Sequence, residues 1–131
     1  MKEELDEKLC KDFPLLYADR NASMQETCMC WGFEVGDGWH DIIYKLSDKL
    51  EKMIKEYEKK NPDAKGIMKA SQVKEKFGTL RYYMTSSTDE MEKVISKAES
   101  QSAKTCEVCG KPGDLTGKGW YRTLCNKCVK K

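Results

Sequence analysis

The sequence predicts an α/β protein of the α+β type, with helices packed on a small antiparallel sheet and a C-terminal zinc-ribbon or short treble-clef module. Three observations lead to this prediction. A long stretch has a 3.6-residue apolar period, two short alternating stretches flank a glycine turn, and four cysteines near the C-terminus have metal-site spacing. We expect a core domain over residues 1–104 and a zinc-binding module over residues 105–131.

The first elements are a short helix and an irregular segment. Leu5 and Leu9 lie one turn apart within residues 2–12, which predicts a helix, and Pro14 fits its end. Residues 13–36 are rich in apolar side chains but have no clear period. We expect them to form an irregular apolar segment packed on the core.

The long helix is predicted over residues 39–60, with Asp37 as its N-cap. Its apolar residues recur every three or four positions, which is typical of a helix with one buried face. Three acid-to-base pairs, four residues apart, are expected on its surface. These pairs are Asp48/Lys52, Glu51/Lys55 and Glu56/Lys60.

Two strands and a third helix follow. Residues 67–76 and 79–85 alternate as strands do, and Phe77-Gly78 supplies the turn between them. In the second strand, alternation separates the apolar face from the face that carries Arg81 and Tyr83. Residues 88–102 are predicted to form a helix, capped by one of the three hydroxyl residues at positions 86–88.

Composition favours an intracellular protein. Charged residues make up 35% of the chain, and no apolar run approaches the roughly 20 residues of a membrane span. The acidic start of the chain does not resemble a signal peptide. A cytoplasmic location is therefore expected, and there the seven cysteines are better explained by metal binding and thiols than by disulfides.

The four C-terminal cysteines form two C-x₂-C pairs separated by fifteen residues, a spacing typical of a four-thiolate zinc site. Such a site has no open position for water or substrate, so the expected cofactor is one structural Zn²⁺. The predicted ligands are Cys106, Cys109, Cys125 and Cys128.

The charge is distributed unevenly. Residues 1–60 contain 14 acidic and 10 basic residues, whereas residues 105–131 contain 2 acidic and 6 basic residues. A basic tail suits an anionic partner. The expected partner of the whole protein is an anionic ligand, either a nucleotide or a nucleic acid, or else a host protein. The alternative is that the lysines partly balance four thiolates around zinc.

A first predicted ligand site is the turn at residues 36–39. Its glycines permit close approach of the backbone, and the helix that starts there offers N–H groups to an anion. Asp37 would compete for those donors, or accept a hydrogen bond from a base or ribose. The candidate residues are Trp31, Asp37, Gly38 and Trp39.

The second predicted ligand site is on the hairpin. Lys74 and Lys76 share a face of one strand, and Arg81 and Tyr83 share a face of the other. If these faces coincide, cations lie beside an aromatic ring and can bind a phosphate-containing ligand. The alternative is an ordinary solvated face.

Two further hypotheses concern the remaining cysteines and the single histidine. Cys10, Cys28, Cys30 and His40 could hold a second metal ion, although their spacing is loose. A Cys–His pair from the same residues could support catalysis. We expect no enzyme, because no other catalytic motif is present and a lone histidine excludes zinc nucleases that need several.

Four motifs occur in an order that resembles a family of small, uncharacterised phage and prophage proteins, and the resemblance runs from about Leu15 to Cys128. That family often ends in Cys-x-x-His, whereas Cys128 takes the last position here. The motifs are Met29-Cys-Trp-Gly-Phe, Gly36-Asp-Gly-Trp, Val73-Lys-Glu-Lys-Phe-Gly-Thr-Leu-Arg-Tyr-Tyr and Cys106-Glu-Val-Cys-Gly.

A phage origin implies a non-enzymatic accessory binding protein in the cytosol of the host cell. One form of this hypothesis is a counter-defence protein that sequesters a nucleotide signal or binds a host defence protein. The alternative is a DNA- or RNA-binding zinc-ribbon protein. The sequence leaves the oligomeric state and the identity of the partner open.

Overall fold

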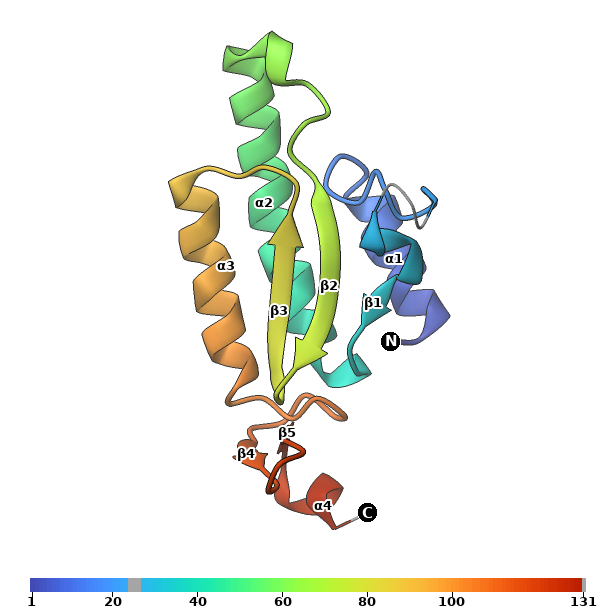
Figure 1. Ribbon diagram of the computed structural model, residues 1–131, viewed down its shortest axis with the longest axis vertical. Helices are drawn as coiled ribbons and strands as arrows, with labels where there is room; N and C mark the ends of the chain where they lie inside the picture. Colours follow the sequence, from blue (N-terminus) through green and yellow to red (C-terminus); the bar gives the residue numbers. More distant parts are fainter. Residues whose placement is uncertain (24–26, 131) are drawn as a thin grey trace.

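The computed structural model describes residues 1–23 and 27–130. Over these ranges the chain has an α+β fold, as predicted, with a C-terminal cysteine cluster that fits a zinc module. Figure 1 shows the helices α1, α2 and α3 around a small sheet, with the cysteine-rich end beneath it. No helix in the described ranges is long and apolar enough to cross a membrane.

The predicted helices are confirmed, with small shifts at their ends. Residues 39–60 form α2 almost as expected, and α4 is a single turn that contains Cys128 of the second cysteine pair. The helices are α1 (Glu3–Asp12), α2 (His40–Lys60), α3 (Asp89–Ser102) and α4 (Asn126–Val129).

The main sheet has the strand order β1-β2-β3, in which β2 (Ala70–Lys76) and β3 (Thr79–Met84) form the predicted antiparallel hairpin. Its turn places Phe77 and Gly78 at φ values of 54° and 87°, as a tight two-residue hairpin turn requires. A left-handed Phe is unusual, because its Cβ is crowded in that region.

The segment over residues 13–36 contains a strand that was not predicted. Phe33–Glu34 forms β1, which pairs in parallel with β2 through Phe33 opposite Val73. A two-residue strand has no alternation that a sequence pattern could detect. Buried Phe33 extends the inner face of the sheet, whereas Glu34 is exposed.

The core lies between the sheet and α2. Ile43, Leu50 and Ile54 are completely buried along the predicted apolar side of α2, and Val73 and Leu80 are completely buried on the sheet. The apolar alternation of β3 and the periodicity of α2 therefore meet at one interface. Figure 1 shows α2 passing behind the β2–β3 hairpin.

Helix α3 lies along the outer edge of β3. Its Glu99 carboxylate accepts a hydrogen bond from the Tyr82 N–H at 2.9 Å, and its Ser102 hydroxyl accepts one from the Leu80 N–H at 2.9 Å. The Thr88 side chain caps the helix by accepting from the Met91 N–H, as predicted. Side chains of α3 thus satisfy backbone donors that an edge strand would otherwise expose.

Two expectations about acidic residues, one on α2 and one just before it, are wrong. Glu51 does not pair with Lys55, because it is buried and accepts the N–H groups of Leu15 and Leu16 at 3.1 and 2.8 Å. Asp37 does not cap α2. It accepts the Lys2 N–H at 2.7 Å instead, and no side chain caps the helix. Both carboxylates hold distant parts of the chain together.

The tail folds into a second, two-stranded sheet beneath the β2–β3 turn. Strand β4 (Asp114–Thr116) pairs with β5 (Arg122–Leu124). The Thr123 hydroxyl donates to the Gly78 carbonyl at 2.7 Å. The tail therefore packs directly on the hairpin end, and the division at residue 104 stays a prediction.

Candidate metal centre and binding surface

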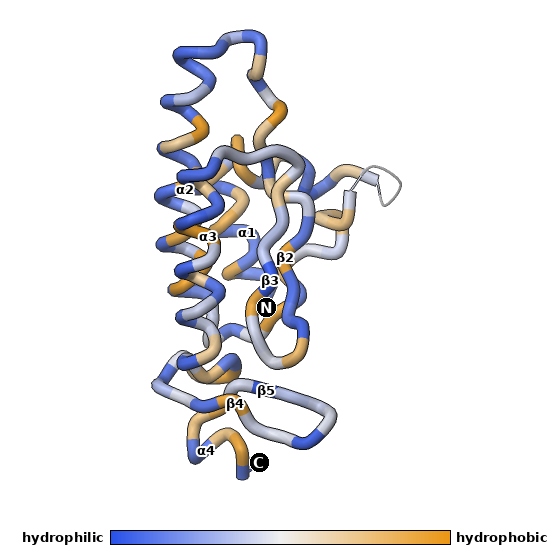
Figure 2. Tube along the Cα trace, turned by 60° about the vertical axis from the view of Figure 1, so that its left-hand side comes forward, coloured by the Kyte–Doolittle hydropathy of each residue, from blue (hydrophilic) through white to orange (hydrophobic). Residues whose placement is uncertain are grey.

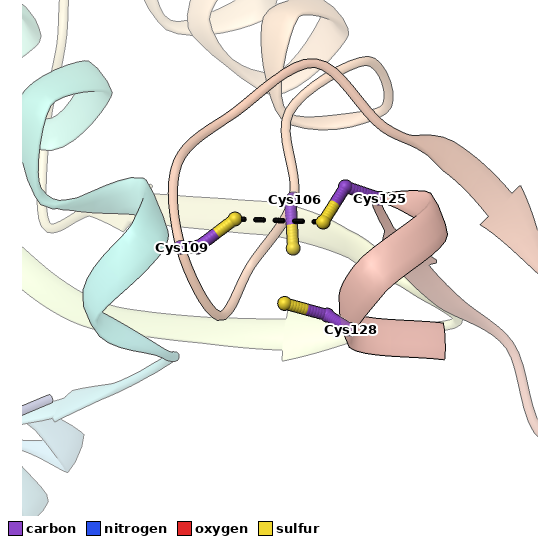
Figure 3. Close-up of side chains that lie close together, drawn as sticks. All are labelled: Cys106, Cys109, Cys125 and Cys128. Atoms are coloured by element: carbon purple, nitrogen blue, oxygen red, sulfur yellow. Dashed lines mark hydrogen bonds between the residues drawn. The ribbon is translucent and has the colours of Figure 1, made fainter. Parts of the chain in front are cut away.

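The four predicted metal ligands come together at the start of α4. Cys106 and Cys109 lie on the loop after α3, and Cys125 and Cys128 flank the first turn of α4. Figure 3 shows their sulfur atoms directed at a common centre. All four sulfurs lie within 4.8 Å of one another, and those of Cys109 and Cys125 are 3.6 Å apart.

These separations fit one tetrahedral ion. With sulfur–zinc bonds of about 2.3 Å, a regular tetrahedron has sulfur–sulfur separations of about 3.8 Å. The four cysteines are therefore close enough to bind one metal ion, which is consistent with a zinc-stabilised domain. Four soft thiolate ligands in this arrangement are typical of Zn²⁺.

Local hydrogen bonds shift the pKa values of three of the thiols, two downward and one upward. Burial raises the pKa of Cys106, but N–H groups of Cys109, Cys125 and Val108 outweigh burial and lower it to about 6. The Cys128 N–H lowers the pKa of Cys125, whereas hydrogen bonding with Cys125 raises the pKa of Cys128 to about 12. A cation would therefore be needed to keep the Cys128 thiol deprotonated at neutral pH.

Each cysteine pair is shaped by short-range backbone bonds. We call the tight turn around each cysteine pair a knuckle. In the first knuckle, the Cys106 N–H donates to the Lys111 carbonyl at 2.7 Å, and the Gly110 N–H donates to the Cys106 carbonyl at 2.9 Å. Gly110 adopts a φ of 81°, which favours glycine. The second knuckle is the first turn of α4, closed by the Val129 N–H on the Cys125 carbonyl at 3.0 Å.

Glu107, inside the first knuckle, attaches the module to the core. Its carboxylate accepts the Gly36 N–H at 2.9 Å, and its carbonyl accepts the Gly38 N–H at 2.7 Å. Burial, the largest influence, raises the pKa of this carboxyl group. Sequence reasoning missed this role, because an acid between two metal ligands has no spacing signal toward a turn 71 residues away.

The turn at residues 36–39 faces the metal centre. The indole N–H of Trp39 donates to the Thr105 carbonyl at 2.8 Å, and the ring is completely buried. A Cβ on Gly38 would collide with the Cys106 carbonyl. The backbone of this turn is therefore closely approached, as predicted, but by the first knuckle of the same chain. Gly36, Gly38, Trp39 and Asp37 all have partners within the chain.

The hairpin brings its predicted cations together. Lys74 and Arg81 are Cα partners across β2 and β3, so their side chains share the face that points away from the core. Tyr83 lies opposite Gln72 on that face and is 42% exposed. Glu34 is the Cα partner of Lys74 on β1 and adds an acidic side chain to the same row.

The start of β5, in the cysteine-rich module, lies next to the hairpin turn, and further cationic and aromatic side chains are exposed there. Lys76 lies with its ammonium 5.6 Å from the ring of Phe77, which is 63% exposed. A Cβ on Gly78 would contact the start of β5 at the Arg122 N atom. Trp120, just before β5, is 81% exposed. We name these side chains the basic–aromatic face: Lys74, Lys76, Phe77, Arg81, Tyr83, Trp120, Tyr121 and Arg122.

Trp31 lies elsewhere, near the N-terminus. It is 59% exposed and lines a cavity of about 650 Å³ beside Asp6, Glu7 and Arg20. Arg20 already donates to the Asp6 carboxylate at 3.0 Å. The structure therefore does not bring Trp31 next to the cationic hairpin, and its role as a ligand residue stays a prediction.

The possible second metal site is not assembled in the described ranges. The close group of metal-ligating atoms found there consists of the four C-terminal cysteines. The Cys10 thiol donates to Asp6 at 3.6 Å, and burial raises its pKa to about 12. Among the described residues, no hydrogen bond joins His40 to Cys28 or Cys30. The His40 Nε2 atom is buried and has no hydrogen-bond partner among them.

No family model, curated protein or solved structure matches the chain. The resemblance to small phage proteins therefore stays a prediction, and function must be argued from the surfaces of the molecule.

Proposed function

We propose that the chain is a non-enzymatic, zinc-stabilised accessory protein that binds single-stranded nucleic acid on its basic–aromatic face. The observation that carries this proposal is the register of the hairpin. Lys74 and Arg81 are directly opposite each other on the solvent side of the sheet, and Tyr83 continues that row.

The chemistry of this face suits a flexible polyanion. Proteins bind single strands by combining cations that follow the phosphates with aromatic rings on which bases stack. Lys76 and Arg81 supply charge, while Phe77 and Trp120 are more than half exposed. The rings are spread from the hairpin to the zinc module, which favours an extended ligand over a compact one.

The zinc centre has a supporting role in this proposal. Four thiolates complete the coordination of the ion, so it has no open position for a substrate. Zinc fixes the β4–β5 hairpin, and thereby Trp120 and Arg122, beside the Phe77 turn. This arrangement supports a binding role for the module over a catalytic one.

The experiment is a fluorescence anisotropy titration with a labelled 20-nucleotide single strand over a series of salt concentrations. Binding should weaken as salt rises, by a slope of about 0.7 per neutralised phosphate. Arg81→Glu should reduce the affinity at least tenfold. The matched control is Lys55→Glu, which makes the same charge change on an exposed residue of α2. Equal losses in both variants, or no binding at low salt, would refute the proposal.

A shallow hollow favours a second candidate function. It has a volume of about 530 Å³ and is lined by residues that include Cys28, Gln72, Lys74 and Tyr83. Pockets of this size hold small ligands. A nucleotide bound there would fit a counter-defence protein that sequesters a nucleotide signal, as the phage resemblance implies.

The two candidates separate in one competition assay. A panel of mono- and dinucleotides is added to the protein in the presence of the labelled strand. Tight binding of one nucleotide, with no affinity for the strand, would support sequestration. Binding of the strand that nucleotides do not displace would support the nucleic-acid role.

A further inference from the structure

A second basic surface lies on the seam between α2 and α3, and it is not part of the basic–aromatic face. Two adjoining hollows, of about 100 and 360 Å³, share Ile42, Lys45 and Gln101 as lining residues. They form one continuous groove along the two helices, which we name the lysine groove. Figure 2 shows α2 and α3 side by side, with hydrophilic residues along both.

The floor of the lysine groove is apolar. Ile42 and Val94 are half-buried and pack against the core, between the buried side chains of Leu46 and Ala98. Apolar atoms at the bottom of an open groove remain in contact with water. A partner that covers them with its own apolar side chains gains about 25 cal/mol per Å² of apolar surface removed from water.

The rim of the groove is cationic. Lys45 and Lys49 extend from α2, Lys97 extends from α3, and Lys104 follows it. All four are exposed, and no acidic group lies within 4.0 Å of their ammonium groups in the described residues. Asp41 at the end of the groove supplies the one carboxylate among the described lining residues.

Two of the four α2 lysines outside the groove have acidic partners on the same helix. Lys52 pairs with Asp48 at 3.0 Å, and Lys60 pairs with Glu56 at 3.4 Å. The acidic partners on α2 therefore serve lysines outside the groove. Lys55 and Lys59, which are also outside the groove, have no ion pair among the described residues either, so what distinguishes the rim lysines is their grouping around one groove.

We propose that the lysine groove binds an acidic amphipathic helix of a partner protein. Carboxylates along the edges of such a helix would face the lysines, and its apolar side chains would fill the floor. A third helix placed on two packed helices is a common arrangement in bundles, and helix-in-groove recognition uses the same geometry. This proposal does not depend on the proposed nucleic-acid function, since the two surfaces share no residue.

The lining argues against other occupants. Nucleic acid would find phosphate partners on the rim but no aromatic side chain for stacking among the described lining residues. Helix α1 is acidic in its first turn, but its Leu9 is completely buried in the core. A second copy of the chain could not offer that helix without unfolding.

The test uses three synthetic helical peptides of 15 residues, held helical by a hydrocarbon staple. The first has leucines on one face and glutamates on the others. The second has lysine in place of every glutamate, and the third has serine in place of every leucine. Binding is followed by calorimetry and by amide chemical shifts of the ¹⁵N-labelled protein in the presence of zinc.

The expected result is binding of the Glu/Leu peptide alone, with shifts centred on Ile42, Lys45 and Val94. The double variant Lys45→Glu/Lys97→Glu should lower the affinity at least tenfold, whereas Lys55→Glu should keep it within twofold. Circular dichroism establishes that each variant is folded.

Several outcomes would overturn the proposal. One is equal binding of the serine peptide, which would mean charge attraction without the groove. Another is an equal loss in Lys55→Glu. A third is a set of shifts in the groove caused by the single-stranded oligonucleotide, or by raising the protein concentration without peptide, which would assign the groove to nucleic acid or to a second copy.

Discussion

The hydrophobic core and the cysteine-rich module of this protein differ in the interactions that stabilise them. The hydrophobic core draws its buried residues from positions 9–98, whereas residues 105–130 contribute none to it. The buried residues of the module are few: Cys106, Glu107, Thr123 and Leu124. One end is stabilised by apolar burial, whereas the other has a few hydrogen bonds to the core and four cysteines close enough to bind a metal ion.

This difference explains why Glu107 and the turn at residues 36–39 matter. A module without its own core has to be positioned by something else. The N–H groups of Gly36 and Gly38 donate to Glu107, and the Trp39 indole N–H donates to Thr105. These contacts hold the β4–β5 hairpin next to the β2–β3 turn, where the Thr123 hydroxyl donates to the Gly78 carbonyl.

The largest expected effect is loss of the metal centre. Cys125→Ser should reduce bound zinc from one equivalent to none and abolish dispersed amide signals for residues 105–130, while α2 keeps its signals. The reason is that ion binding supplies the folding free energy of the module. The control is Cys28→Ser, an exposed cysteine outside the cluster. Full zinc retention in Cys125→Ser would contradict the four-thiolate site.

A smaller effect, but one on the whole core, is expected at Glu51. Glu51→Ala leaves the N–H groups of Leu15 and Leu16 without an acceptor, and should lower the free energy of unfolding by about 3 kcal/mol. Urea denaturation followed by circular dichroism measures this change. Glu56→Ala removes an exposed acid from the same helix and should cost less than about 0.5 kcal/mol. An equal loss of stability in Glu51→Ala and Glu56→Ala would show that Glu51 does not connect the segment over residues 13–36 to α2.

Gly38→Ala tests the docking of the module. Its Cβ would collide with the Cys106 backbone, so we expect a loss of about 1–3 kcal/mol. Hydrogen exchange should speed up at the backbone around Glu107 while zinc stays bound. Gly66→Ala is the comparison, because a Cβ there meets nothing within 4 Å and only the φ of 81° opposes it. Unchanged exchange in Gly38→Ala would mean that the close contact does not position the module.

The smallest expected effect is a change in pH dependence. The Tyr44 hydroxyl donates to Asp12 at 2.6 Å, and this bond is the main cause of the lowered pKa of Asp12. A lowered folded-state pKa means that the stabilisation exists above the unfolded pKa and is lost as the pH falls through the folded pKa. Tyr44→Phe should therefore raise the Asp12 pKa and make the stability less sensitive to acid below about pH 4.

Carboxylate titration by NMR checks this last prediction. Lys8 also bonds Asp12, and Lys8→Met removes both its hydrogen bond and its charge, so the Asp12 pKa should rise in this variant too. An unchanged Asp12 pKa in Tyr44→Phe would contradict the assigned cause.

The parts of the fold that follow a local period could be predicted from the sequence. The apolar stripe of α2, the apolar–polar alternation of β3 and the Phe77-Gly78 turn are each determined by residues close together in the sequence. The metal ligands were also predictable, because the chemistry of the site requires two close pairs. Lys74 and Arg81 could be placed on one face only by assuming the register that the structure shows.

The rest depends on contacts between residues far apart in the chain. Strand β1 is too short to have a period, and Glu51 follows the helix pattern of a surface acid although it is buried. The lysine groove was missed for a similar reason. Lys45 and Lys97 are 52 positions apart, and only the packing of α2 on α3 places them on the same groove.

X-ray absorption at the zinc edge tests the central claim most directly, namely that one ion held by four thiolates builds the module. The measurement is made on the wild-type chain purified with one equivalent of zinc. We predict a single shell of four sulfur atoms at about 2.3 Å. A shell that contains nitrogen or oxygen atoms, or fewer than four sulfur atoms, would contradict the account.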